Sequence, residues 1–397
     1  MQNSIEQAFA DLLQWCRLRE FAGHDPFDAL NSRLLQATPL AHSRTARLIS
    51  TQLIKRSPWN LRLLARVPGQ KNSKGIALFA LASLSRYRVL KSPEAEKEAR
   101  ELLDELLRMQ IVGYSGAAWG YNFDWQSRNF FAPRGTPMIV PTAFAARALL
   151  DAHGTFKDAK YLEIARSSCE FILKDLRRTP DSDDPEGELC FSYSPLDETR
   201  VFNASLFAAD TLACVGVLAG ESDFGGIAND LAIRAARYVV RRQHEDGSWS
   251  YGAGPGQLWV DSSHTAYVLL SLSRIMKCLP GGEIDLKPAL ERGYRFWRER
   301  FFLADGWPKY YDDTLYPADS HSAATAIITL IELQELDCQA LPLAETIAAW
   351  TLRNLRDSRG FFYYERRRFY TVRTPFMRWT QAWVLYALAR LLEAKNL

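Results

Sequence analysis

Long apolar runs are missing from this 397-residue chain. No stretch approaches the roughly 18 consecutive apolar residues that a membrane-spanning helix needs, so no span is expected. The first 16 residues lack a basic region followed by an apolar core, which argues against a secretory signal. The cysteines are scattered and form no CxxC pair, as reduced, buried thiols would be: Cys16, Cys169, Cys190, Cys214, Cys278 and Cys338. We therefore expect a cytoplasmic protein.

An excess of charge of one sign is also missing. The chain has 49 Lys and Arg against 46 Asp and Glu, a formal net charge of +3. This balance gives no reason to expect nucleic acid or an anionic membrane as the main partner. The sequence also lacks a phosphate-binding glycine loop, a metal-ligand cluster and a Ser-His-Asp signature in a recognisable context. We expect no metal and no obligatory cofactor; the oligomeric state stays open.

What the sequence does contain is an internal repeat. Each copy opens with a polar or capping element and continues into an Ala- and Leu-rich helix, as in FNASLFAADTL, SHTAYVLLSL and SHSAATAIITL. Equivalent positions are Pro141, Asn203, His264, His321 and Trp379, separated by 62, 61, 57 and 58 residues. A weaker sixth copy places Lys74 at the same position, 67 residues before Pro141.

A second set of helices alternates with the first and is charged on one face only, as in NDLAIRAARYVVRRQ and LKPALERGYRFWRER. Helices that are apolar on nearly every face are expected in the inner layer, and helices that are apolar on one face only are expected in the outer layer. The pattern predicts an all-α (α/α)6 toroid over residues 1–397 as a single domain, with repeated hairpins from 73 to 397. Residues 1–72 supply the helices that close the ring, with 39–57 as the sixth outer helix. An open solenoid is the alternative.

The connections from outer to inner helices are long and aromatic, as in AAWGYNFDW, DGSWSYG and DGWPKYYDD. Long connections of this kind usually carry a function. All must emerge beside the starts of the inner helices, so we expect one elaborated mouth.

One connection contains QHEDGSW, from Gln243 to Trp249, which resembles the QW repeat of triterpene cyclases and prenyltransferase β subunits. In those families the Gln, Asp and Trp tie an outer helix to the following loop. The segment DSDD at 181–184 is similar to the acid motif of squalene-hopene cyclases. A terpene-cyclase role is a minor alternative, because DSDD lies in a polar loop.

Over most of its length, from GHDPFDALNS (23–32) through WGYNFDWQSR (119–128), FNAS and DSHSAA, the chain resembles a bacterial family. Its members are encoded in exopolysaccharide and capsule loci and are sometimes labelled aminolevulinate dehydratase. That label implies a β/α barrel, which a helical repeat does not form. The layout is also similar to six-hairpin glycosidases, lyases and N-acylglucosamine 2-epimerases. These resemblances imply a carbohydrate substrate; whether it is acidic, free, or linked to a nucleotide or lipid stays open.

Candidate catalytic residues gather at the first turns of the inner helices. His264 and His321 can exchange protons near neutral pH, and Tyr310 in the connection DGWPKYYDD is a third candidate for proton exchange. Asp261 and Asp319 precede the two histidines and can cap the helices, orient the imidazoles or act on substrate. Asp124 is a further carboxylate candidate.

Candidate substrate-binding residues are aromatic, basic or amide side chains of the mouth. Trp and Tyr rings stack on sugar faces, and arginine forks onto carboxylates or phosphates. The set comprises Trp119, Tyr121, Trp125, Arg128, Arg134, Tyr193, Asn203, Trp249, Lys309, Tyr311, Arg378 and Trp379.

Three functions compete on these residues. A sugar epimerase, isomerase or lyase that works by proton transfer predicts an open pocket with paired histidines. A glycoside hydrolase predicts two facing carboxylates about 5 to 9.5 Å apart. A non-catalytic glycan-binding or scaffold protein predicts a filled mouth. The sequence favours the first narrowly.

Overall fold

The computed structural model describes residues 2–128, 130–181, 187–218, 220, 222–279, 281 and 283–396. Two concentric sets of helices dominate it. The inner helices are α4 (Ser73–Leu90), α6 (Ile139–Phe156), α8 (Phe202–Leu218), α10 (Ser262–Cys278), α12 (Ser320–Glu332) and α14 (Trp383–Asn396). The outer helices are α1 (Gln2–Arg17), α5 (Pro93–Arg108), α7 (Ala159–Lys174), α9 (Asp223–Val240), α11 (Glu283–Arg300) and α13 (Ala340–Leu355).

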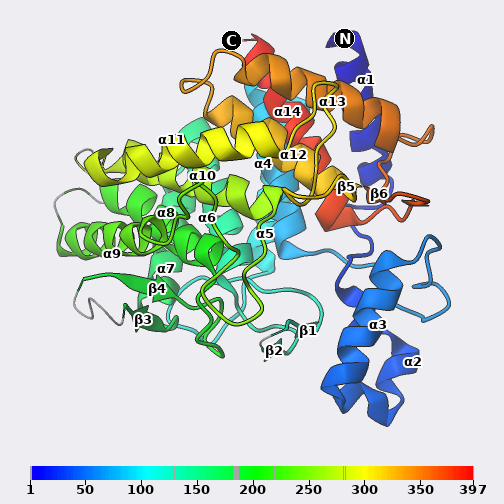
Figure 1. The fold of residues 1–397 in the computed structure, drawn as a ribbon, viewed down its shortest axis with the longest axis horizontal. Coiled ribbons are helices and arrows are strands. Elements are labelled where there is room, and N and C mark those ends of the chain that lie inside the picture. The colour runs from blue at the N-terminus through cyan, green and yellow to red at the C-terminus, as the bar shows by residue number, and fades with distance from the viewer. Residues whose placement is uncertain are drawn as a thin grey trace.

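The inner helices form a closed ring. Each packs against the next in chain order, and the last, α14, packs against the first, α4 (Figure 1). Most residues of α8 are buried all round the helix, whereas α5 buries one stripe, with Ala95, Ala99, Leu102 and Leu106. This contrast between inner and outer helices is the one that the sequence predicts. The all-α toroid is confirmed, and the open solenoid is wrong.

The sixth outer helix is α1 and not the segment 39–57. Helix α1 packs against α14 and buries Ile5, Phe9, Leu12 and Leu13. Segment 39–57 instead forms η2 (Pro39–His42) and α3 (Arg44–Arg56), and Thr51 is the one buried residue of α3. The prediction of 39–57 is wrong because α3 buries no apolar face against the ring: Ile49 and Leu53 are exposed. With η1 (Asp28–Asn31) and α2 (Arg33–Gln36), α3 projects beside the ring (Figure 1).

Side-chain caps fix where several inner helices begin. Asn72 accepts hydrogen bonds from the backbone N–H groups of Lys74 and Gly75 at the start of α4. Asp261 and Asp319 cap α10 and α12 by accepting from the N–H groups of His264 and Ser322. These caps satisfy donors that no helical carbonyl reaches.

Short antiparallel strands lie in the connections between the helices. Strand β1 pairs with β2, β3 with β4, and β6 lies between β5 and β7. The strands are β1 (Trp125–Gln126), β2 (Phe131–Ala132), β3 (Arg178–Pro180), β4 (Leu189–Phe191), β5 (Ala318–Asp319), β6 (Glu365–Arg366) and β7 (Thr371–Val372).

The QW-like segment ties outer helices together, as its resemblance implies. The Gln243 amide donates to the carbonyls of Gly247 and Ala289, and the Trp249 indole donates to the carbonyl of Val239. Trp249 is buried against Gly293 of α11. Of DSDD, residues 182–184 lie outside the described residues, and Asp181 pairs with Arg242 at 2.9 Å.

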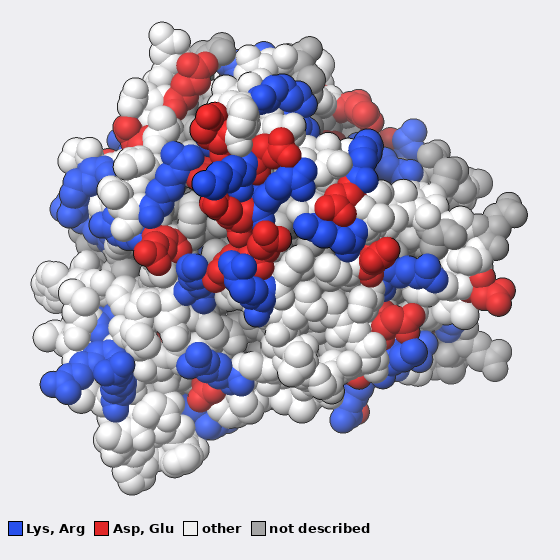
Figure 2. Space-filling model, turned by 180° about the vertical axis from the view of Figure 1, so that it is seen from behind, with Lys and Arg blue, Asp and Glu red and all other residues white. Residues whose placement is uncertain are grey.

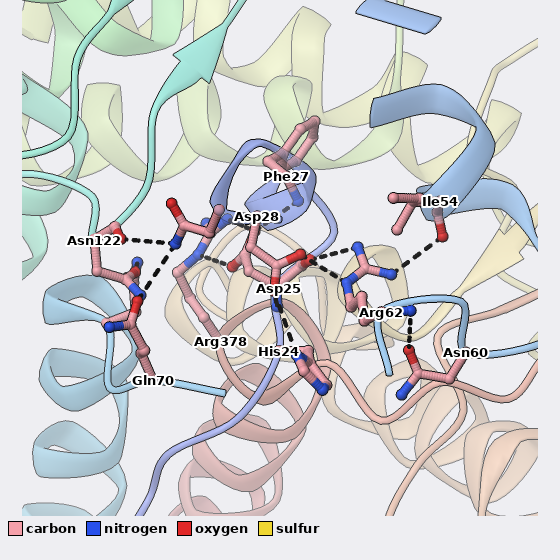
Figure 3. A network of polar contacts seen from close by, with 12 residues as sticks. His24, Asp25, Phe27, Asp28, Ile54, Asn60, Arg62, Gln70, Asn122 and Arg378 are labelled. Carbon is pink, nitrogen blue, oxygen red and sulfur yellow. Dashed lines mark hydrogen bonds and ion pairs between the residues drawn. The ribbon is translucent and has the colours of Figure 1, made fainter. Parts of the chain in front are cut away.

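Segment GHDPFDALNS anchors the N-terminal chain through a buried polar network (Figure 3). Asp25 receives two hydrogen bonds from Arg378, at 2.5 and 2.8 Å. Asp28 accepts from the Arg62 guanidinium at 2.6 Å, and Arg62 also donates to the Asp25 carbonyl at 2.7 Å. The network joins residues from both ends of the chain.

Arginines gather at the opposite end of the ring, where the inner helices finish. Arg88, Arg147, Arg274 and Arg390 line a cavity of about 340 Å³ with Asp151, Asp210 and Glu332. Cations near helix C-termini interact favourably with the negative end of the helix dipole. In the part of the chain that the structure describes, no helix is long and apolar enough to cross a membrane.

We expect Gly293→Ala to lower the free energy of unfolding by about 1–3 kcal/mol, because the new Cβ overpacks a filled space. That Cβ would lie 2.2 Å from Cζ3 of Trp249. Gly226→Ala is the matched control, since Gly226 is also helical and its Cβ would meet nothing within 4 Å. The control should gain up to about 1 kcal/mol from helix propensity. Urea unfolding of both variants measures the difference, and equal effects would contradict the packing role of Gly293.

Candidate active site

A pocket of about 610 Å³ opens at the mouth, where the inner helices begin. The repeat brings its equivalent first-turn residues together here, because each inner helix starts at the same end of the ring. Lys74, Asn203, His264, His321 and Trp379 all line the pocket. The N-terminal ends of helices attract negative charge, so their convergence makes this pocket favourable for an anion.

His264 belongs to an Asp–His pair. The Nδ1 atom of His264 lies 2.5 Å from Oδ2 of buried Asp261, which also accepts from the Trp259 indole at 3.0 Å. Burial favours a raised pKa for Asp261, but the His264 imidazole and these hydrogen bonds lower it below its usual value. The ionised carboxylate therefore holds Nδ1 as the donor. Nε2 has no partner among the described residues and is free for a ligand.

A second pair lies one helical turn deeper. The Tyr267 hydroxyl is 2.5 Å from Nε2 of His321, and the ring centroids of Tyr267 and His264 are 6.0 Å apart. Burial raises the pKa of Tyr267 well above 10, so its phenol stays protonated. Burial, together with the charges of Lys74 and Arg378, lowers the pKa of His321 well below 6.5, so its imidazole stays neutral.

Basic side chains form the floor of the pocket. Lys74 is 3% exposed, and its Nζ lies 4.4 Å from the ring centre of Phe144 and 5.2 Å from that of Trp383. Burial lowers the pKa of Lys74 well below 10.5, and the Arg378 guanidinium adds to this effect. Cation–π contacts replace part of the lost hydration, but no described residue accepts a hydrogen bond from Nζ of Lys74.

Several polar atoms around this floor also have no partner among the described residues. They are the side-chain amide oxygen Oδ1 of Asn203, Nδ1 of His321 and the indole nitrogen of Trp379. A buried polar group without a hydrogen bond costs about 1–3 kcal/mol. Their concentration in one place is what a site for a polar ligand requires.

Aromatic side chains make the walls. Tyr121 and Trp125 contact each other edge to face, with ring centres 5.9 Å apart. Tyr251 stacks on Trp259 at 4.4 Å. The lining also includes Tyr193, Tyr310, Tyr311, Arg128 and Arg378. Rings of this kind offer flat surfaces to sugar C–H groups.

Other predicted residues lie outside the pocket lining. Asp124 orders its own loop by accepting from the Arg134 N–H at 2.7 Å, and Arg134 is exposed. Trp119 and Trp249 are buried and donate to the carbonyls of Leu106 and Val239. Lys309 donates to the carbonyls of Arg300 and Asp312.

Asp261 and Asp319 lie behind the lining, each as the cap of an inner helix. Asp319 is fully buried, and its Oδ2 has no partner among the described residues. Burial raises its pKa to about 6, against two hydrogen bonds from Ser322 that lower it.

Among the lining residues that sequence reasoning missed, four bear on the chemistry: Lys74, Tyr251, Trp259 and Tyr267. Tyr267 follows His264 by three positions, a spacing that places both on one helical face. Lys74 occupies the repeat position of His264 but was assigned no role there. Tyr251 and Trp259 lie in the aromatic connection before α10, and their mutual stacking had no signal in the sequence.

No family model and no curated protein matches the chain. Solved structures do match. Cellobiose 2-epimerase from Bacillus thermoamylovorans is 12% identical, with 83% of this chain and 90% of that chain covered and a TM-score of 0.62. An α-mannanase of glycoside hydrolase family 76 from Bacteroides thetaiotaomicron is 14% identical, with 82% and 86% covered and a TM-score of 0.61. This chain is an (α/α)6 toroid.

A further match is D-mannose isomerase, which is 13% identical over 80% of this chain and 86% of that chain, with a TM-score of 0.57. At such low identities the likeness establishes the fold alone. In the described part of the chain, no group of three or more His, Cys, Asp or Glu side chains is arranged to hold a metal.

We predict that Asp319 makes the free energy of unfolding depend on pH. Its pKa of about 6 in the folded chain exceeds its ordinary 3.8, so the folded state binds more protons between these values. Stability from this group is therefore greatest at low pH and is lost as pH rises through 6. From pH 4.5 to 7.5, the free energy of unfolding of Asp319→Asn should rise by about 2 kcal/mol relative to the native chain.

Urea titrations at the two pH values test this. Asparagine can also accept the capping hydrogen bond at the start of α12, so the substitution removes the charge and keeps the cap. Asp158→Asn, at the more accessible cap of α7, is the matched control. A difference that stays constant with pH would contradict the burial of an unpaired Asp319 carboxyl.

Proposed function

We propose that the protein is a carbohydrate-active enzyme of bacterial polysaccharide biosynthesis or modification. Its chemistry is proton transfer at a sugar carbon beside a carbonyl or carboxylate, of the epimerase, isomerase or lyase type. The observation that carries this proposal is the Asp261–His264 pair at an open pocket, with Nδ1 held and Nε2 available.

His264 is the proposed base. Asp261 fixes the tautomer and ring orientation and stabilises the imidazolium that forms when Nε2 takes a proton. Asp261 is itself a positioning residue, because Trp259, His264 and the backbone of α10 occupy its oxygens.

Tyr267 is the proposed acid. Its phenol stays protonated and lies on the same face of α10 as His264, one turn below, so it can return a proton to a second position of the sugar. His321 holds the phenol through Nε2. Proton removal places negative charge on the sugar oxygen, and the helix N-termini and basic floor stabilise that charge.

The other functions fit the pocket less well. Of the described residues that line it, Asp313 alone is acidic, whereas a glycoside hydrolase needs two facing carboxylates. A binding or scaffold protein predicts a filled mouth, but this one is hollow. The neighbours include sugar epimerases, an isomerase and hydrolases, which supports a sugar as substrate. Cytoplasmic location and the exopolysaccharide-locus family rest on the sequence alone.

Proton NMR in D₂O tests the reaction. Purified protein is incubated with uronic acids, N-acetylhexosamines and their nucleotide-linked forms, and deuterium entry at one carbon is followed. We expect His264→Gln and Tyr267→Phe each to slow the exchange by about 10²–10⁴-fold, the usual contribution of a general acid or base.

His153→Gln is the matched control, because His153 lies in the last turn of α6 at the far end of the ring. It should leave the exchange rate unchanged. Glycosidic cleavage without exchange, insensitive to both pocket variants, would move the assignment to a hydrolase. No exchange with any sugar of the panel would count against the proton-transfer proposal.

The pocket charge further favours an anionic sugar. Lys55, Arg56, Lys74, Arg128 and Arg378 line it against the single Asp313. Arg378 is paired with Asp25, but Lys74 has no carboxylate within hydrogen-bonding distance among the described residues. A carboxylate or phosphate would supply that missing partner.

We therefore expect calorimetry to show tighter binding of glucuronate than of glucose, and Lys74→Met to weaken glucuronate binding by about 10- to 100-fold. Lys74→Arg is the control that keeps the charge. Methionine is apolar and of similar length, so the variant should stay folded, with an equal or higher melting temperature. Equal affinity of the native chain and Lys74→Met for glucuronate would contradict this role.

A further inference from the structure

Charge is distributed unevenly along the chain. Residues 29–72, named here the basic lobe, contain eight Lys and Arg residues and no Asp or Glu. Subtracting eight from the net +3 of the whole chain leaves −5 for the remainder. Arg62 pairs with Asp28 and Lys71 with Glu105 across the boundary of the lobe, so six of its eight Lys and Arg have no carboxylate partner among the described residues.

The basic lobe also exposes large apolar side chains. They are Leu34, Leu40, Ile49, Leu53, Trp59, Leu63 and Leu64, of which the last three are 73–76% exposed. Ile49 and Leu53 are four residues apart and so share one face of α3. Exposed apolar groups concentrated in one segment indicate an interaction surface.

This lobe projects from the ring. It lies at the lower right of Figure 1 and, seen from behind, at the lower left of Figure 2, where blue side chains flank a broad white surface. Elsewhere on the face in Figure 2, red and blue side chains are interspersed. The lobe is thus distinct in charge from the body that carries it.

A second element continues this surface. The hairpin of β6 and β7, residues 365–372, exposes Arg368 and Phe369, the latter at 86%. The Tyr370 hydroxyl at this hairpin donates to the Arg56 carbonyl at the end of α3, at 3.2 Å. Basic and aromatic side chains from two distant parts of the sequence therefore adjoin at one place.

We propose that the basic lobe and the β6–β7 hairpin dock the protein on the surface of an anionic lipid bilayer. Leu, Ile, Trp and Phe side chains enter the boundary between headgroups and acyl chains, while Lys and Arg contact the lipid phosphates. A nucleic acid would use the basic residues but not the exposed Leu side chains. A second copy that met this surface lobe to lobe would bring the same positive charge and be repelled.

Docking in this way brings the pocket to the bilayer. Leu48, Gln52, Lys55 and Arg56 of α3 line the mouth pocket, while Ile49 and Leu53 of the same helix are exposed. One helix thus connects the docking surface with the proposed active site. The docking itself does not depend on the sugar chemistry.

Vesicle flotation with the full chain tests the proposal. We expect binding to vesicles with roughly one-third phosphatidylglycerol and little binding to phosphatidylcholine alone. Binding should weaken as salt rises from about 50 to about 500 mM, because salt screens surface charge. Tryptophan quenching by brominated lipid should fall in Trp59→Phe.

Two sets of variants separate the contributions. Leu53→Gln with Leu63→Gln and Leu64→Gln removes the apolar contribution, and Arg33→Glu with Arg66→Glu reverses charge. Each set should weaken vesicle binding by at least about tenfold. The matched controls are Leu90→Gln with Val112→Gln and Ile227→Gln, which are exposed apolar residues elsewhere, and Lys287→Glu with Arg295→Glu on α11. The controls should bind as the native chain does.

Three outcomes would overturn the proposal. The first is no preference for anionic vesicles at low salt. The second is loss of binding in the charge variant alone, with the apolar variant unaffected, which indicates a general polyanion surface. The third is self-association in analytical ultracentrifugation that the apolar variant abolishes, which assigns the lobe to an interface between copies of this chain.

Discussion

The ion pair between Asp25 and Arg378 determines how the two ends of the chain meet at the mouth. These residues are 353 positions apart, both are buried, and two hydrogen bonds join them. A buried charge that loses its partner is strongly destabilising, so this contact fixes the segment around Asp25 against η3 (Met377–Ala382). Through Asp28 and Arg62 the same network holds the basic lobe beside the pocket (Figure 3). The pair also acts on Lys74 in opposite directions, because the Arg378 guanidinium lowers the pKa of Lys74 and the Asp25 carboxylate raises it.

The closed ring imposes an electrostatic asymmetry on the two ends of the molecule. The inner helices begin at the mouth, where five basic side chains line the pocket and, of the described lining residues, Asp313 alone is acidic. The opposite end of the ring holds the arginines Arg88, Arg147, Arg274 and Arg390 together with carboxylates. The arginines offset the negative ends of the helix dipoles, and the carboxylates offset the remaining positive charge. At the mouth, Asp25, Asp261 and Asp319 lie behind the lining, so the surface that faces the pocket is mainly basic. An arrangement of this kind suits an anionic ligand, or negative charge that develops on a sugar oxygen during a reaction.

The repeat in the sequence was sufficient to predict the inner helices, because a buried helix needs apolar residues on every face. It also placed His264, His321 and Asn203 at one mouth. It failed where a residue's neighbours come from distant segments. The choice of α1 over 39–57 as the sixth outer helix depends on which apolar face finds α14. Trp119 and Trp249 recur in the aromatic connections because they tie loops to outer helices, a structural duty that repeats with the fold. The Asp25–Arg378 pair left no local pattern at all.

Whole-chain averages misrepresent this protein for the same reason. A net charge of +3 predicts no anionic partner, yet the basic lobe has eight Lys and Arg and no acid of its own. At the pocket floor, Lys74 has no carboxylate partner among the described residues. Burial disfavours the charged form of Lys74, and an anionic ligand would favour that form by supplying the counter-charge. Exposed Leu and Trp side chains in the basic lobe are unfavourable in water. An anion in the pocket would supply the counter-charge of Lys74, and a lipid surface over the lobe would remove its apolar side chains from water.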